Sequence, residues 1–209
     1  MPRTPDDVHW ADYNAAQQGR EVRPLCREVM ELAGPGAGRQ AVDLGCGLGL
    51  ETRALLRAGW RVHAVDGEPG TGDRVLTTTR GCDRSRLTVE VRRFADLAAL
   101  PPADLVYAGY SLPFADPGDF GRLWAVVRGS LRPGGWFAAN LFGDRDAWAG
   151  TMHGTFLALS EVRQHLDGLQ IVELHEEDGP GSSYRGPKHW HAFHVIARRP
   201  ETPFSDTSP

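Results

Sequence analysis

Three glycines alternate with other residues in Gly45-Cys46-Gly47-Leu48-Gly49, directly after a short apolar run at residues 40–44. Glycine is needed at such points when the backbone must turn tightly and a ligand must approach without meeting a Cβ atom. An amphipathic stretch follows at residues 51–58, so the loop stands where a buried strand should turn into a helix. The loop therefore predicts an α/β fold with a ligand at this turn.

Short apolar runs alternate with longer amphipathic runs along the rest of the chain. The apolar runs predict strands at residues 40–44, 61–65, 87–94, 103–108, 136–142, 169–175 and 189–197. The other runs predict helices at residues 7–18, 24–32, 51–58, 71–79, 120–131 and 160–166. Ser160 is the expected N-cap of the last helix. This alternation indicates a doubly wound, mostly parallel sheet with helices on both faces.

The length of 209 residues suits one α/β domain with its own core. We assign residues 1–199 to this domain, with residues 1–38 as a helical segment that caps the site and residues 200–209 as a disordered tail. No apolar run reaches the roughly 18 residues of a membrane helix. The first residues also lack the apolar stretch of a signal peptide, so we expect a cytoplasmic protein without a membrane partner.

The charges and cysteines exclude other classes of partner. The net charge of −4 weighs against nucleic acid, because phosphate binding needs a basic face. Three widely spaced cysteines indicate neither a disulfide framework nor a zinc ribbon. His189 and His191 share one face of a predicted strand and would need His175 or Glu176 to form a metal site. Strand histidines more often pack and form hydrogen bonds than bind a metal, so we expect no metal site. Because nucleic acid is disfavoured, we expect a small-molecule substrate.

Asp66 stands at the end of the second predicted strand. From there a carboxylate can accept hydrogen bonds from both hydroxyls of a ribose, so the loop and the acid together indicate a nucleoside-containing ligand. The dinucleotide fingerprint requires a small residue three positions after its second glycine, and Leu50 stands there instead. No second domain remains to hold a hydride acceptor. An NAD-linked oxidoreductase is therefore a weaker alternative.

The run Asp43-Leu44-Gly45-Cys46-Gly47-Leu48-Gly49 resembles motif I of the class I methyltransferases that use S-adenosylmethionine (SAM). The resemblance covers nearly the whole chain, with later motifs at Val65-Asp66, Phe94-Ala95-Asp96-Leu97, residues 103–109 and residues 131–135. Residues 156–179 and 188–198 look most like the small tellurite-resistance-type (TehB-like) branch. The resemblance implies a Rossmann-like, seven-stranded sheet whose last strand is antiparallel.

The same resemblance implies which residues hold the cofactor. Asp66 would bind the ribose, Asp96 the adenine amino group, and the carbonyl of Ala108 would face the ammonium group. The full implied set is Tyr13, Asp43, Gly45, Cys46, Gly47, Gly49, Asp66, Gly67, Ala95, Asp96, Leu97 and Ala108.

Methyl transfer from a sulfonium is an in-line displacement that forms no oxyanion, so alignment of the reacting atoms can supply much of the acceleration. A general base is needed only when the acceptor must lose a proton. Ligands of open α/β sheets bind outside the carboxyl ends of the strands. The loops there carry the catalytic or positioning candidates His153, Tyr110 and His189, and the acceptor contacts Tyr110, Tyr184, His189 and Trp10. We expect residues 175–188 to form one wall of the acceptor pocket, with a shaped loop at residues 176–187.

These observations predict a SAM-dependent methyltransferase that acts on a small-molecule acceptor by in-line displacement. A SAM-binding protein that does not methylate, such as a sensor or scaffold, is an alternative, because donor binding and catalysis are separable. Formation of the demethylated cofactor in the presence of an acceptor distinguishes the two.

Overall fold

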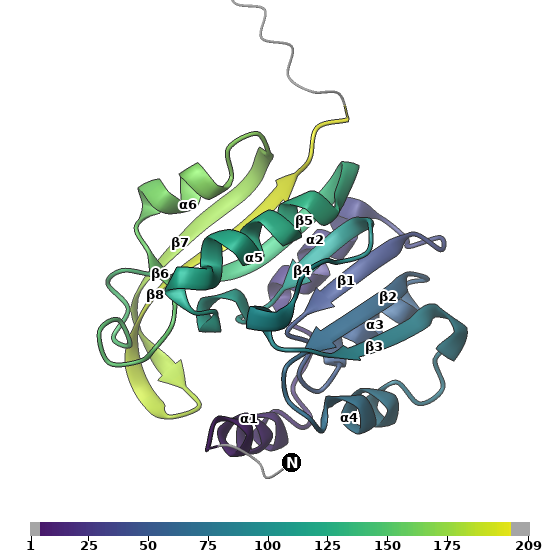
Figure 1. Cartoon of the computed structure of the whole chain (residues 1–209), viewed down its shortest axis with the longest axis horizontal. Coiled ribbons are helices and arrows are strands. Elements are labelled where there is room, and N and C mark those ends of the chain that lie inside the picture. Colours follow the sequence, from purple (N-terminus) through teal and green to yellow (C-terminus); the bar gives the residue numbers. More distant parts are fainter. Residues whose placement is uncertain (1–4, 202–209) are drawn as a thin grey trace, which may run out of the picture.

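A computed structural model describes residues 5–201 of the chain (Figure 1). The strands are β1 Gln40–Leu44, β2 Arg61–Asp66, β3 Leu87–Val91, β4 Ala103–Ala108, β5 Leu131–Gly143, β6 Phe156–Leu157, β7 Gln170–Ser183 and β8 Gly186–Arg198. The α-helices are α1 Pro5–Ala16, α2 Pro24–Ala33, α3 Leu50–Arg57, α4 Thr71–Thr78, α5 Pro117–Ser130 and α6 Leu159–His165. The tail predicted at residues 200–209 lies outside the described residues from position 202 onward.

Within residues 5–201 the strands form one sheet in the order β3-β2-β1-β4-β5-β8-β7, and the short β6 pairs with β5 outside this path. Strands β1 to β5 are mutually parallel, whereas β8 runs antiparallel to both β5 and β7. The prediction of a Rossmann-like, mostly parallel sheet with an antiparallel last strand is confirmed. Strand β6 is an addition that the sequence analysis did not predict.

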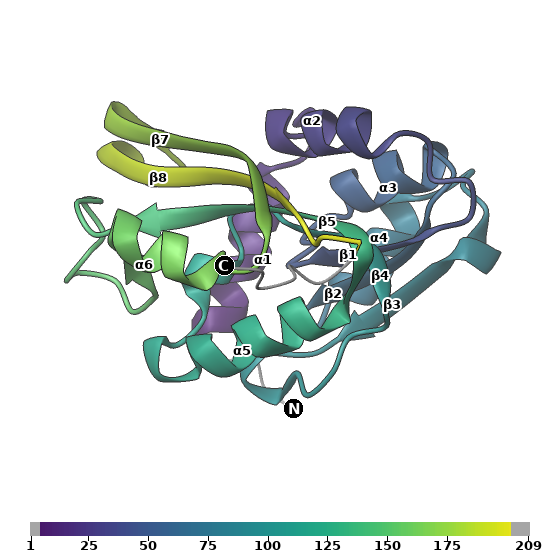
Figure 2. The ribbon, with the colours of Figure 1, turned by 90° about the horizontal axis from the view of Figure 1, so that it is seen from above.

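Helices cover both faces of the sheet (Figure 2). Helices α2 and α3 bury Val29 and Leu55 against one face, in a cluster that includes Trp60. Helices α5 and α6 bury Leu123 and Val162 against the other face. The parallel strands β1 and β4 are almost completely buried because both of their faces are covered.

Local capping explains where two helices begin. The side chain of Asp116 accepts a hydrogen bond from the Gly118 N–H at 2.7 Å, and Pro117 occupies the first turn, so α5 starts three residues before its predicted start. Ser160 is not an N-cap, so that prediction is wrong. Helix α6 already begins at Leu159, and the Glu161 carboxylate reaches back to accept from the Ala158 N–H at 2.7 Å.

The last two strands differ most from their prediction. Residues 176–187 are not a shaped loop, because β7 continues to Ser183 and β8 starts at Gly186, which leaves only a two-residue turn. Pro180 is tolerated because β7 is an edge strand and a missing N–H costs no ladder bond on its open side. At Gly181 a Cβ atom would lie 2.6 Å from Cδ1 of Trp190, so glycine makes room for the indole.

Among the described residues, no helix combines the length and apolar character needed to span a membrane.

Candidate functional site

A cavity of about 300 Å³ opens at the carboxyl ends of the parallel strands. Its lining comes from the loops that follow β1, β2 and β4, from the turn after β3, and from α1 with the chain that joins it to α2. Helix α1 lies across this edge of the sheet (Figure 1). The N-terminal segment therefore contributes residues directly to the lining of the cavity.

The glycine loop forms the floor of the cavity. Gly45 and Gly47 line it with φ angles of 78° and 51°, in the left-handed region that favours glycine. A Cβ atom on Gly45 would lie 2.2 Å from the Cβ of Ser111, and one on Gly47 would lie 2.8 Å from Oδ1 of Asn14. The loop is therefore packed closely between the turn after β4 and helix α1.

Asp66 holds the same loop from the side of β2. Its carboxylate accepts from the Gly47 N–H at 2.9 Å, the Glu68 N–H at 3.0 Å and the Thr71 hydroxyl at 3.3 Å. Burial raises the pKa of this carboxyl above its usual value, partly offset by these hydrogen bonds. A carboxylate offers about four lone-pair positions, so Asp66 retains acceptor capacity toward the cavity that it lines.

Asp43 lies near the end of β1, just before the glycine loop. Its carboxyl group is buried and accepts a hydrogen bond of 2.6 Å from the Thr52 hydroxyl. Burial, reinforced by the charge of Glu51, raises the pKa of Asp43 to about 7. The group therefore changes its protonation near neutral pH while it lies at the start of the glycine loop.

Two arginines enter the site between α1 and α2. Arg20 pairs with Glu51 through two hydrogen bonds of 2.7 and 2.9 Å. Burial acts to raise the pKa of Glu51, but the hydrogen bonds and charge of Arg20 bring it below its usual value. The Arg23 guanidinium donates to the Tyr13 hydroxyl at 3.2 Å, and the Arg23 backbone N–H donates to the Glu51 carboxylate at 3.0 Å.

Tyr107 contributes a polar atom without a partner. Its hydroxyl oxygen is buried and forms no hydrogen bond within the described residues, and the residue lines the cavity. A buried, unpaired hydroxyl is costly, so a ligand group that bonds to it would be favoured. A Cβ atom on Gly109 would lie 2.3 Å from this oxygen, which explains the glycine after β4.

Tyr110 forms the wall beside the end of β4. It is one of two described non-glycine residues with a positive φ, at 51°, and its ring contacts the rings of Phe142, Trp190 and His194 at centroid distances of 5.8–6.3 Å. The Arg23 guanidinium lies 4.9 Å from the ring centroid. Burial, with a smaller contribution from the charge of Glu177, raises the pKa of Tyr110 to about 12, so the phenol stays protonated at neutral pH.

Aromatic side chains form the rim. Trp10 meets Phe114 edge to face at 4.7 Å, and Tyr13 meets Tyr184 in the same way at 5.6 Å. Trp10, Tyr13 and Phe114 line the cavity, whereas Tyr184 supports Tyr13 from the turn between β7 and β8. The hairpin tip thus reaches helix α1 above the site.

The structure brings only part of the expected set together. The expected residues that line the cavity are Trp10, Tyr13, Asp43, Gly45, Cys46, Gly47, Asp66, Gly67, Ala95 and Tyr110. Gly49, Asp96, Leu97, Ala108, Tyr184, His153 and His189 are not in the lining. Gly49 instead caps α3, and Leu97 is buried in the core under α5.

Two expected catalytic histidines lie outside the cavity. His153 is exposed and bonds at 2.7 Å to Asp116, which does line the cavity. His189 is exposed and bonds at 2.6 Å to Asp178. Successive side chains of a strand point to opposite faces, so His189 lies on the face of β8 opposite Lys188 and Trp190.

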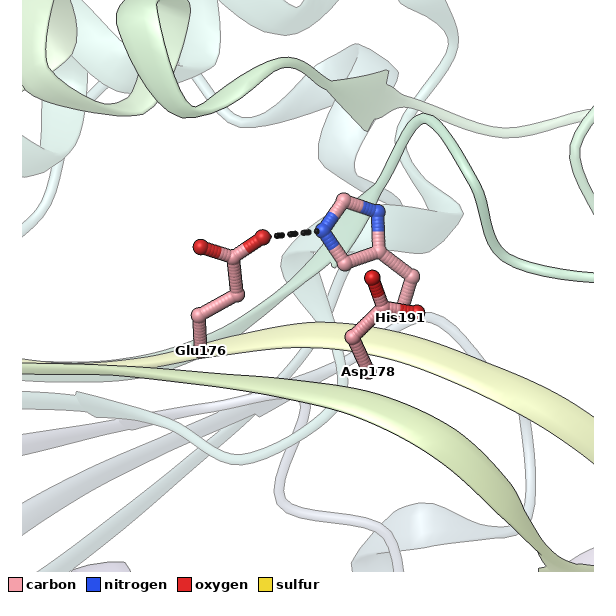
Figure 3. A group of neighbouring side chains, drawn as sticks. All are labelled: Glu176, Asp178 and His191. Carbon is pink, nitrogen blue, oxygen red and sulfur yellow. Dashed lines mark hydrogen bonds and ion pairs between the residues drawn. The ribbon is translucent and has the colours of Figure 1, made fainter.

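Glu176, Asp178 and His191 offer potential metal-ligand atoms within 4.8 Å of one another (Figure 3). The Arg145 guanidinium already bonds to both carboxylates, at 2.6 and 2.7 Å. Nδ1 of His191 accepts from the Arg145 backbone N–H at 2.9 Å, so Nε2 carries the proton that bonds to Glu176. The group is therefore a closed ion-pair network, and this imidazole presents no free lone pair to a cation.

Sequence reasoning missed several lining residues. They include Asn14, Gln17, Arg20, Arg23, Glu51, Tyr107, Ser111, Phe114, Asp116 and Asp119. Tyr107 lies within the recognised motif at residues 103–109, and Glu51 and Ser111 stand close to recognised motifs. The rest come from α1, its connection to α2 and the start of α5, where no local pattern distinguishes a ligand contact from an exposed polar residue.

Comparisons with known proteins agree with this geometry. The family model described as a methyltransferase domain matches residues 42–137. A probable cobalt-precorrin-6B C(15)-methyltransferase (decarboxylating) of Methanothermobacter thermautotrophicus is 32% identical over 120 residues, which are 55% of this chain and 57% of that protein. The chain therefore spans little more than half the length of this curated relative.

Solved structures share the fold over most of the chain. TehB from Haemophilus influenzae has a TM-score of 0.75 at 14% identity, covering 91% of this chain and 67% of that one. The 1,6-didemethyltoxoflavin-N1-methyltransferase of Burkholderia thailandensis, solved with bound 1,6-didemethyltoxoflavin and S-adenosylhomocysteine, has a TM-score of 0.64 at 21% identity. That comparison covers 96% of this chain and 92% of the other.

Proposed function

We propose that the chain is a class I SAM-dependent methyltransferase and that it transfers the methyl group of SAM to a small-molecule acceptor. One observation carries the proposal. The glycine loop, Asp66 and the aromatic rim surround a single cavity, so a donor site and an acceptor site are continuous.

The residues of the cavity fit SAM. Asp66 retains about one acceptor position for a ribose hydroxyl, and the hydroxyl of Tyr107 needs a partner. Arg23 provides a cation for a carboxylate, and the glycines at 45 and 47 let a ligand approach the backbone. When bound, SAM supplies a methyl group on a positively charged sulfur, which the lone pair of an acceptor can attack.

The chain's own contribution is to orient the acceptor and exclude water. Trp10, Tyr13, Tyr110 and Phe114 offer flat apolar faces, which favour a planar or apolar acceptor. Holding reactants in line can account for a large part of a displacement's acceleration. If the acceptor must lose a proton, Asp116 with its partner His153 is the pair placed to receive it at the rim.

Two features support a small acceptor. The cavity of about 300 Å³ is at the lower end of the range of small-molecule sites and is closed on one side by α1. The net charge of −4 disfavours nucleic acid. The names of two relatives, which specify a cobalt-precorrin and a didemethyltoxoflavin, are consistent with this class. The match to the methyltransferase model leaves the NAD-linked alternative without support.

Calorimetry with S-adenosylhomocysteine and with NAD tests donor binding. We expect micromolar affinity for S-adenosylhomocysteine and no comparable binding of NAD; a preference for NAD would refute the assignment. Incubation with SAM and a panel of small acceptors then tests transfer. Tight SAM binding without demethylated product from any acceptor would favour the alternative of a non-methylating SAM-binding protein.

A further inference from the structure

Lys188 is the only lysine of the chain, and it is almost completely buried, with 4% of its side chain exposed. Its ammonium nitrogen lies 2.5 Å from Oδ1 of Asp146, whose side chain is fully buried. The same nitrogen lies 3.5 Å from the ring centroid of Trp148, 3.8 Å from that of Trp190 and 5.1 Å from that of Phe142. These residues, Phe142, Asp146, Trp148 and Trp190, form what we call the lysine box.

Stability alone does not account for the lysine box, because removing an ion pair from water costs about as much free energy as the attraction between the charges returns. Burial lowers the pKa of Lys188, while Asp146 acts to raise it. Cation–π contacts contribute most when the cation is desolvated, as it is here. An apolar residue would fill the same space without the desolvation cost, so the charge needs another explanation.

Asp146 ties the box to the surrounding backbone. Its carboxylate also accepts from the Trp148 N–H at 3.0 Å and from the His191 N–H at 3.1 Å. The ion pair therefore joins strand β8 to the loop that follows β5. The contacts of Asp146 therefore hold β8 and this loop together next to Trp190.

Trp190 connects the box to the cavity. Its ring meets the ring of Tyr110 edge to face at 5.8 Å, and Phe142 contacts Tyr110 at 6.2 Å. Lys188 and Trp190 share one face of β8, and Gly181 on β7 leaves space for the indole. Tyr110 itself holds a φ of 51°, a conformation that a tyrosine keeps only when its surroundings enforce it.

We propose that Lys188 is a positioning residue, which holds Trp190 and Phe142 against Tyr110 and thereby fixes the acceptor-side wall of the cavity. The inference rests on the proposed function in identifying this wall as the acceptor side. Lys188 does not line the cavity, so it acts through Tyr110 and not on a ligand.

The ring signals of tyrosine test the proposal without an acceptor, because the chain has only four tyrosines. In protein labelled with 13C-tyrosine, a Tyr110→Phe variant identifies the Tyr110 signals. Lys188→Ala should shift or broaden these signals more than those of Tyr107 and Tyr184. Propylammonium, which has the size of the atoms removed, should return them toward their original positions, whereas the neutral propanol should not.

Arg39→Ala is the matched control, because Arg39 also lies over a tryptophan, with its guanidinium carbon 4.4 Å from the Trp60 ring centroid. This variant should leave the Tyr110 signals unchanged. Unchanged Tyr110 signals in folded Lys188→Ala would overturn the proposal, as would a shift that propylammonium fails to reverse.

If Lys188→Ala does not fold, the double variant Lys188→Met/Asp146→Asn keeps the volume of the box and removes both charges. Shifted Tyr110 signals in this variant support the proposal, and unshifted signals overturn it. Affinity for S-adenosylhomocysteine should stay within about twofold in every folded Lys188 variant, because the donor contacts lie elsewhere. Absence of that binding in the unaltered protein would instead count against the proposed function.

Discussion

Replacing Gly47 by alanine should separate the packing of helix α1 from the binding of the donor. The φ of 51° at Gly47 lies in a region that costs other residues about 1–2 kcal/mol. That strain should lower the free energy of unfolding by about the same amount. The added Cβ would also lie 2.8 Å from Oδ1 of Asn14, so the buried Asn14 side chain, which packs α1 against the loop, must move.

Because α1 and the loop both line the cavity, we expect Gly47→Ala to weaken S-adenosylhomocysteine binding by about tenfold, or roughly 1.4 kcal/mol. Calorimetry measures the affinity and urea unfolding measures the stability. Adding Asn14→Ala removes the steric conflict but not the backbone strain. The double variant should therefore recover much of the affinity and none of the lost stability.

Gly49→Ala provides the matched control. Gly49 has a φ of 78° but lies outside the cavity, where a Cβ would meet Val75 at 3.1 Å. This variant should lose stability while its affinity stays within about twofold of the original. The reasoning fails if folded Gly47→Ala binds S-adenosylhomocysteine normally, or if Gly49→Ala weakens binding as much as Gly47→Ala does.

Four further substitutions test the site. Asp66→Ala should weaken S-adenosylhomocysteine binding by about 1–3 kcal/mol in calorimetry, because ribose hydroxyls lose a charged acceptor; unchanged affinity would show that Asp66 does not contact the ribose. Tyr184→Ala should raise the Michaelis constant of any acceptor found in the product assay, whereas His189→Ala should not, since only Tyr184 supports the rim. Asp43→Asn should change the pH dependence of stability. The folded pKa of about 7 exceeds the ordinary 3.8, so the folded protein binds the extra proton between these values and its unfolding free energy falls as pH rises through them. The asparagine variant should lack this decline in urea titrations, and an identical decline in both proteins would contradict it.

The parallel strands could be predicted from sequence because each carries its own signal. The strand at Ala103–Ala108 was predicted with its observed bounds, since it is buried on both faces and reads as a continuous apolar run. The glycine loop and Asp66 were located for a related reason. Their spacing follows from local backbone geometry between one strand and the next, so it can be recognised in a short stretch of sequence.

The hairpin of β7 and β8 could not be predicted in the same way. Gly179, Pro180 and Gly181 are typical of a loop, yet they lie in a strand, because the edge position tolerates the proline and the indole of Trp190 needs the space at Gly181. These causes are contacts with residues about ten positions away or with the open edge of the sheet. No periodic pattern of residues within the segment indicates these contacts.

The same distinction separates the two halves of the site. Gly45, Gly47 and Asp66 sit within about one β-α-β unit, so a motif can describe them and a family can be identified from them. The opposite half is assembled from Trp10 on α1, Tyr110 after β4 and Phe114 before α5, with Tyr184 of the hairpin supporting it. Each of these residues is placed by tertiary packing, so no single local motif describes them together. Under the proposed function, the glycine loop therefore indicates the donor alone, and the aromatic rim is the part of the site that must be probed to identify an acceptor.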